Sequence, residues 1–156
     1  MNEQVRNAVS WWMVKEHNLT QVNQDPFVSF FIYYLCLDAI LSAESEKDSD
    51  RDRLEWLIQT ENELKHAFGE NAFDKNILLE LKELSPVADM RPHYRDKAVS
   101  LEDIDDFAQV IRFIYQIRCN LFHGGKSPTE DRDKALITYA GKFLKNWIRY
   151  LVPCGI

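Results

Sequence analysis

The sequence predicts an all-α fold, a bundle of five to six helices in which residues 1–156 form a single domain. The length of 156 residues suits one domain, which at this size buries enough surface to fold without disulfides or a metal. Glycine is scarce, with five residues, whereas all-β folds need glycine-rich turns at nearly every hairpin. Apolar residues recur at helical spacing, and no segment carries a strand pattern.

Two helices are predicted in the first third of the chain. The first covers residues 3–16. The second begins at Pro26 with Asp25 as its N-cap, because the N–H that proline lacks would have no partner in the first turn of a helix. Residues 27–43 are strongly apolar, but they fall short of the roughly 18 residues that a membrane span needs, and they contain Asp38. We therefore expect a buried core helix and no membrane span.

The middle of the chain is predicted to alternate between loops and short helices. An acidic loop covers residues 44–52, and a third helix runs from Leu54 to about Gly69. Residues 72–84 form a short, leucine-rich fourth helix. Residues 86–99 contain two prolines and are expected to be irregular.

Capping signals predict the last two helices. Ser100 and Asp103 resemble a capping box that opens a helix ending at the glycine pair 124–125, since glycine is favoured after a helix C-terminus. A capping box over residues 127–130 opens the final helix. The helix after Ser100 carries two adjoining apolar stripes, which indicate a central helix or one at a dimer interface. The second of these stripes consists of Phe107, Val110, Ile114, Ile117 and Leu121.

Composition indicates a cytoplasmic protein with an uneven charge. The three cysteines form no paired framework, no Cys or His spacing predicts a zinc site, and no signal peptide is apparent. The net charge is −6, but residues 1–106 hold 11 basic and 22 acidic residues, whereas residues 107–156 hold 8 basic and 3 acidic ones. Such a split indicates an anionic partner such as nucleic acid, or a basic part that pairs with the acidic part inside the fold.

Two charged residues occupy positions that the helical pattern reserves for apolar side chains, Asp38 in the second helix and Arg118 in the penultimate one. An unpaired buried charge costs several kcal/mol, so each needs a carboxylate, a phosphate or a water-filled cleft. The simplest arrangement pairs Asp38 with Arg118. His123 follows Arg118 by five residues, and at about 100° per residue their side chains point about 140° apart on a continuous helix. They converge only if the helix ends between them or a second chain supplies another copy.

The run Ile-Arg-Cys-Asn-Leu-Phe-His-Gly-Gly-Lys at residues 117–126 resembles the R-x4-6-H motif of HEPN domains, the higher eukaryotes and prokaryotes nucleotide-binding family. The segments FIYYLCLDAIL and SDRDRLEWL also resemble the early helix pair of that family, in which a polar residue often stands where Asp38 does. The resemblance covers Pro26 to about Trp147.

This resemblance implies a bundle that dimerises through the motif region and, in many members, acts as a metal-independent endoribonuclease without a cofactor. The implied reaction is attack of a ribose 2′-hydroxyl on the adjacent phosphate, which leaves a 2′,3′-cyclic phosphate and a 5′-hydroxyl. Arg118 would hold the phosphate and His123 would be the general base or acid. Asn120 would bond the phosphate or orient the histidine, and Lys126 would add positive potential. RNA, a second copy and an antitoxin protein are the implied partners, in a toxin or defence setting.

Alternatives remain open at this stage. Catalytic members often carry Asn or Asp directly after the arginine, where this chain has Cys119. A non-catalytic HEPN-like module that binds RNA, nucleotide or a partner protein is therefore the second interpretation. The third is a structural bundle in which Asp38 and Arg118 set the helix register. A thiol nucleophile formed by Cys119 and His123 is disfavoured, because no third residue to orient them is evident.

Overall fold

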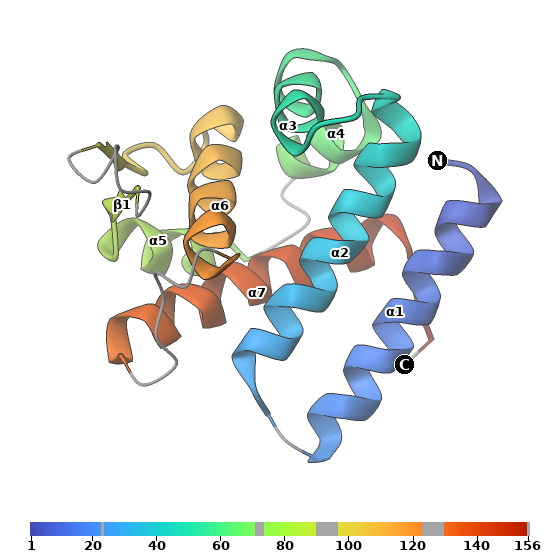
Figure 1. The fold of residues 1–156 in the computed structure, drawn as a ribbon, viewed down its shortest axis with the longest axis horizontal. Helices are drawn as coiled ribbons and strands as arrows, with labels where there is room; N and C mark the ends of the chain where they lie inside the picture. The colour runs from blue at the N-terminus through green and yellow to red at the C-terminus, as the bar shows by residue number, and fades with distance from the viewer. Residues whose placement is uncertain (23, 71–73, 90–96, 123–129, 156) are drawn as a thin grey trace.

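The computed structural model describes residues 1–156 except 23, 71–73, 90–96, 123–129 and 156. The described ranges contain seven helices and one two-stranded sheet, which confirms the predicted all-α bundle (Figure 1). In chain order the elements are α1 (Glu3–Val22), α2 (Pro26–Ser45), α3 (Asp50–Gln59), α4 (Glu63–Gly69), α5 (Lys75–Glu83), β1 (Val87–Ala88), β2 (Ala98–Val99), α6 (Phe107–Phe122) and α7 (Asp131–Leu151).

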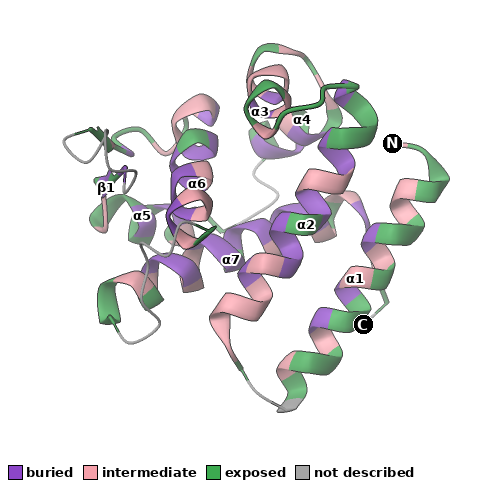
Figure 2. Ribbon diagram, viewed as in Figure 1, coloured by how far each residue is buried: buried purple, intermediate pink, exposed green. Residues whose placement is uncertain are grey.

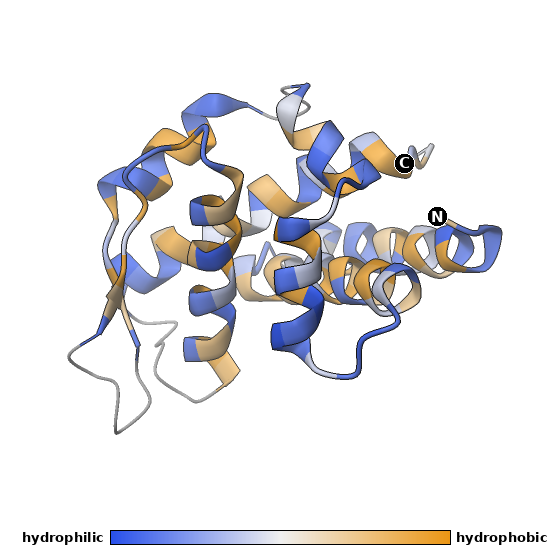
Figure 3. Cartoon of the chain, turned by 90° about the horizontal axis from the view of Figure 1, so that it is seen from above, coloured by the Kyte–Doolittle hydropathy of each residue, from blue (hydrophilic) through white to orange (hydrophobic). Residues whose placement is uncertain are grey.

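Helices α2 and α7 cross at the centre of the molecule and form its most extensive contact (Figure 1). The two helices lie close together at Gly141, where an added Cβ would already be in van der Waals contact with the backbone of Phe30 at 3.4 Å and a larger side chain would have no room. Helix α1 runs alongside α2, and α3 and α4 lie near the C-terminal end of α2. Helices α5 and α6 and the small sheet lie beside the N-terminal part of α7, at the end of the molecule away from both chain termini (Figure 1, Figure 3).

A single apolar core lies between these helices, and Figure 2 shows the buried residues facing the inside of the bundle. Trp147 is fully buried on α7, and its indole N–H donates to the Leu64 carbonyl oxygen at 2.9 Å. Its ring lies 5.9 Å from that of Phe107, which in turn lies 5.0 Å from the ring of Phe68. These contacts connect α4, α6 and α7 in one packed unit.

Helix α2 is the only one in the described ranges that is long and apolar enough to cross a membrane, with 20 residues. Of its most apolar window, 44% is buried inside the structure. The packing of α2 against α1, α3 and α7 is that of the core helix that the sequence predicts. The predicted cap is also present, since the Asp25 carboxylate accepts from the Phe27 N–H at 2.9 Å.

Several predicted boundaries were wrong because polar side chains cap helices at unexpected places. The acidic loop is short, since α2 continues to Ser45 and Ser49 caps α3. The predicted third helix is two helices, because Asn62 accepts from the Lys65 N–H at 2.9 Å and begins α4. Helix α1 extends past its predicted end to Val22.

Helix α6 begins at Phe107, seven residues after the predicted start at Ser100. Asp106 caps it, because its carboxylate accepts from the Gln109 backbone N–H at 3.2 Å and also from the Gln109 side-chain amide at 3.1 Å. Burial follows the second apolar stripe, whose first four members are buried. Helix α7 begins at Asp131 with Glu130 at the N-cap position, so the final helix starts later than the predicted box, of which residues 127–129 lie outside the described ranges.

The small sheet is the other departure from the prediction. Val87 pairs with Val99 and Ala88 with Ala98 in antiparallel register, at the two ends of the segment expected to be irregular. Two residues per strand are too few to produce a period-2 pattern, so the sequence carries no recognisable strand signal. The pair matters for the site because β1 contacts α6.

Candidate functional site

Arg118 projects from the C-terminal half of α6 toward the start of α3. Its Nη2 donates to the Asp50 carboxylate at 2.6 Å. The Arg118 side chain is 22% exposed, so its guanidinium is neither sealed in the core nor freely solvated. Its Nε–H is buried and finds no hydrogen-bond partner among the described residues.

Three aromatic rings surround this guanidinium. Its Cζ lies 4.3 Å from the ring centre of Phe122, 5.5 Å from that of Tyr34 and 6.0 Å from that of Tyr115. Cation–π attraction at these distances stabilises a charge that is partly removed from water. Burial raises the pKa of the Tyr115 phenol to about 12 and that of Tyr34 further still, so both phenols stay neutral beside the cation.

Asp38 does not contact Arg118; the two are joined through a second ion pair. Asp38 accepts from the Arg53 guanidinium at 3.1 Å, and Arg53 lies 3.6 Å from Asp50, the partner of Arg118. Acids and arginines thus alternate from α2 through α3 to α6. The predicted direct pair was wrong because Asp50, the partner of Arg118, lies in the segment expected to be a solvated loop, and Arg53, the partner of Asp38, directly follows that segment.

Asn120 is also placed differently from the expectation. It is buried, its amide donates to the Ala88 carbonyl oxygen at 2.7 Å, and its side-chain oxygen accepts from Gln116 at 2.9 Å. A substrate phosphate cannot reach it in this conformation, so its observed role is to attach α6 to β1. His123 and Lys126 lie outside the described residues.

The uneven charge of the sequence is partly resolved by ion pairs within the fold. Three cations of the basic C-terminal part bind acids of the N-terminal part: Arg118 with Asp50, Arg112 with Glu55 at 3.4 Å, and Lys145 with Glu16 at 3.3 Å. Internal pairing, one of the two interpretations of the charge split, therefore accounts for these three of the eight basic residues.

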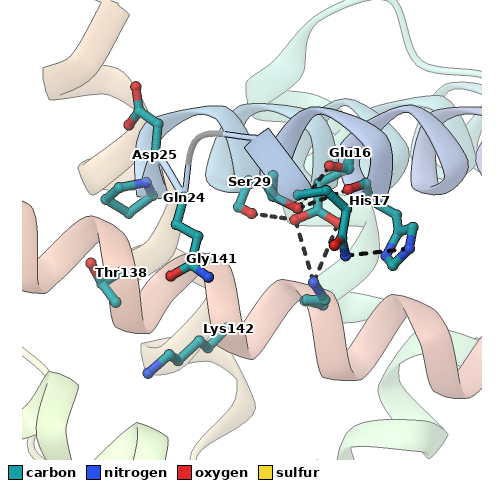
Figure 4. Close-up of a pocket in the computed structure, with 12 residues that line it drawn as sticks. Glu16, His17, Gln24, Asp25, Ser29, Thr138, Gly141 and Lys142 are labelled. Atoms are coloured by element: carbon teal, nitrogen blue, oxygen red, sulfur yellow. Dashed lines mark hydrogen bonds and ion pairs between the residues drawn. The ribbon is translucent and has the colours of Figure 1, made fainter. Parts of the chain in front are cut away.

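A second polar site, which the sequence analysis missed, surrounds Glu16 between α1, α2 and α7 (Figure 4). Glu16 is fully buried. Its carboxylate accepts from the Ser29 hydroxyl, from the Tyr33 hydroxyl at 3.4 Å and from the Lys145 ammonium at 3.3 Å to each oxygen. A buried charge needs this degree of compensation.

The Glu16 site borders a cavity of about 320 Å³ between the C-terminal part of α1, the start of α2 and the middle of α7. A signal for it existed in the sequence. Val9, Met13 and Glu16 are spaced four and three residues apart and all are buried, so Glu16 occupies an apolar position of α1 just as Arg118 does on α6.

Comparisons of the chain with protein-family models, with curated proteins and with solved structures give no match. Among the described residues, no three His, Cys, Asp or Glu side chains are grouped in a way that could hold a metal ion. The chemistry of both sites therefore has to be inferred from their own side chains.

Proposed function

We propose that this protein is a metal-independent endoribonuclease of the HEPN type that acts as a homodimer. Arg118 binds the scissile phosphate and His123 is the general acid or base. The observation that carries the proposal is the Arg118 guanidinium, which is partly exposed, framed by aromatic rings and placed five residues before the histidine of the R-x4-H motif.

A guanidinium in this setting suits phosphate binding. Its planar donors match two phosphate oxygens at once, and its charge offsets the negative charge that builds on the phosphate during attack. The Nε–H is buried and has no partner among the described residues, so the donors that a phosphate can reach are those at the partly exposed end of the guanidinium. Asp50 occupies Nη2 at 2.6 Å and holds the guanidinium in place.

The reaction needs one proton to leave and one to arrive. A base takes the proton of the ribose 2′-hydroxyl as its oxygen attacks phosphorus, and the bond from phosphorus to the 5′-oxygen breaks when that oxygen receives a proton. An imidazole with an ordinary pKa of about 6.5 serves in either step near neutral pH. Two copies of the chain would supply one histidine for each step.

An exposed apolar surface beside Arg118 supports the homodimer. Phe122 is 53% exposed and Leu35 is 43% exposed. Phe31, one helical turn before Leu35, contacts Phe122 with ring centres 5.1 Å apart. Large apolar side chains exposed together are typical of interaction surfaces. A second copy covering them would bring a second Arg118 near the first.

The test is cleavage of a structured RNA pool in EDTA by the wild type, His123→Ala and Arg118→Ala. Two variants serve as matched controls, since His66 is an exposed histidine and Arg112 an exposed arginine on the same helix as Arg118. We expect products with 2′,3′-cyclic phosphate ends from the wild type, His66→Ala and Arg112→Ala, and a loss of about 100-fold or more in the His123 variant.

RNA binding without cleavage by the folded wild type would refute the nuclease and favour the module that binds RNA, nucleotide or a partner protein. Cleavage that survives His123→Ala would place the chemistry elsewhere. Circular dichroism of each variant shows that the fold is intact. Sedimentation of the wild type and of Leu35→Glu tests the dimer, since a charge in the apolar surface should yield monomers.

A further inference from the structure

The cavity beside Glu16 is separate from the proposed nuclease site. Its walls come from α1, α2 and α7, whereas Arg118 contacts α3 and the aromatic residues around it. Tyr33 and Tyr34 are neighbours on α2, yet Tyr33 contacts Glu16 and Tyr34 contacts Arg118. The two polar sites therefore lie on different sides of α2.

The charge accessible from this cavity is positive. Glu16 contributes no exposed surface, whereas the Lys145 side chain is 31% exposed. An ammonium has three N–H donors and Glu16 offers two oxygens, so one donor of Lys145 is left for a ligand. The Asp25 carboxylate points away from α7 in Figure 4 and caps α2. Arg149 brings a further positive charge near the Tyr33 hydroxyl, which itself bonds Glu16.

Lys142 also lines the cavity from α7 and adds to its positive charge, and the remaining polar side chains of the lining are uncharged. Gln24 projects between α2 and α7 in Figure 4, and Thr138 lines the cavity from α7. His17 and Gln21 line it from α1, with their side-chain nitrogens 3.5 Å apart. Amide, imidazole and hydroxyl groups exchange hydrogen bonds with hydroxyl groups of a ligand. A cavity of about 320 Å³ accommodates a molecule of monosaccharide size.

We propose that this cavity binds a small hydroxylated anion, a sugar-like compound that carries one phosphate or carboxylate group. The anionic group lies against the free donor of Lys145, and the hydroxyl groups bond Gln24, Thr138 and the α1 side chains. Glu16 fixes the Lys145 ammonium and does not touch the ligand. This explains why a buried ion pair is present at a position where an apolar pair would pack equally well.

The experiment is isothermal titration calorimetry of the full chain with glucose, glucose 6-phosphate and glucuronate, which share a ring and differ at C6. We expect the two anions to bind and glucose to bind at least about tenfold more weakly, as expected when one charge-assisted contact is missing. The phosphate and carboxylate arms show which anion is preferred. Inorganic phosphate alone should bind more weakly than glucose 6-phosphate.

Two variants locate the binding. Thr138→Phe fills the cavity from α7 and should abolish it. Glu16→Gln combined with Lys145→Met removes both charges, leaves an amide oxygen and an NH2 group to bond the Ser29 and Tyr33 hydroxyls, and should reduce anion affinity to that of glucose. Lys134→Met removes one exposed charge of α7 outside the cavity and should change nothing.

Absence of binding by all probes at 10-millimolar scale would overturn the proposal, as would binding that survives Thr138→Phe. Equal binding of glucose and glucose 6-phosphate would overturn the role given to Lys145. Arg118→Ala should leave the affinity unchanged. A loss in that variant would assign the anion to the nuclease site, so the failure of this inference is distinct from the failure of the ribonuclease.

Discussion

Replacing Lys145 by methionine should destabilise the protein much more than replacing the whole ion pair. The ammonium lies 3.3 Å from both oxygens of a fully buried carboxylate. At an effective dielectric constant near 20, charges about 4 Å apart attract by about 4 kcal/mol. Water that reaches the partly exposed Lys145 side chain reduces this attraction. We therefore expect Lys145→Met to lower the free energy of unfolding by about 2–3 kcal/mol.

The double variant Glu16→Gln/Lys145→Met should cost only about 0–1 kcal/mol, because no uncompensated charge remains and the glutamine amide bonds both hydroxyls, accepting from one through its oxygen and donating to the other through its NH2 group. Urea unfolding followed by tryptophan fluorescence measures both changes. The coupling free energy in the double-mutant cycle should then be about 2 kcal/mol. A single variant that loses less than about 1 kcal/mol, with additive effects in the cycle, would refute the conclusion that the lysine neutralises Glu16.

The remaining predictions concern alkaline pH, helix packing, a cap and the Arg118 pair. Burial, with a smaller effect of Glu16, raises the pKa of the Cys36 thiol to about 12. The folded state keeps this proton while the unfolded chain loses it near pH 9, so stability should fall between about pH 9 and 12 in urea titrations, and less so in Cys36→Ala. Gly141→Leu should lower the unfolding free energy by about 2 kcal/mol or more through overpacking against Phe30, seen as a lower melting temperature in calorimetry. Asn62→Ala should cost about 1 kcal/mol in urea by removing the cap of α4. Asp50→Asn should weaken RNA retention in a filter-binding assay if the carboxylate orients Arg118, and stronger retention would instead show that it blocks the phosphate.

The helices themselves were predictable because their apolar residues face one core. The stripe formed by Phe107, Val110 and Ile114 is fully or nearly fully buried, and Asp25 with Pro26 begins α2 where the sequence placed it. Helix boundaries were less predictable. Ser100 and Asp103 have the composition of a cap, but it is the Asp106 carboxylate that caps the helix, through two hydrogen bonds from Gln109. Sequence alone does not rank two such candidates.

The charged residues of the candidate site could be predicted one by one, but their ion-pair partners could not. Arg118 and Asp38 stand out because each interrupts an apolar pattern, and that signal is local. Their partners, Asp50 and Arg53, lie in and directly after the predicted acidic loop of residues 44–52, in which nothing distinguishes one carboxylate from its neighbours. Which carboxylate faces the arginine depends on how α3 packs against α6, a long-range property that one sequence does not contain.

Glu16 shows the same local signal, a charged residue at an apolar position of a helix. Glu16, Asp38 and Arg118 all occupy positions of apolar series, and in the structure each one has an oppositely charged partner. The pairs differ in what surrounds them. Asp38 belongs to a chain of ion pairs that joins α2 to α3. Arg118 and Lys145 are each partly exposed, Arg118 beside aromatic rings and Lys145 beside a polar cavity. An oppositely charged partner offsets the cost of burying any charge, so an ion pair by itself does not indicate a ligand-binding site. A cationic group that stays partly exposed after pairing, beside aromatic rings or a cavity, does indicate one, and for this reason we propose ligand binding at Arg118 and Lys145 and not at Arg53.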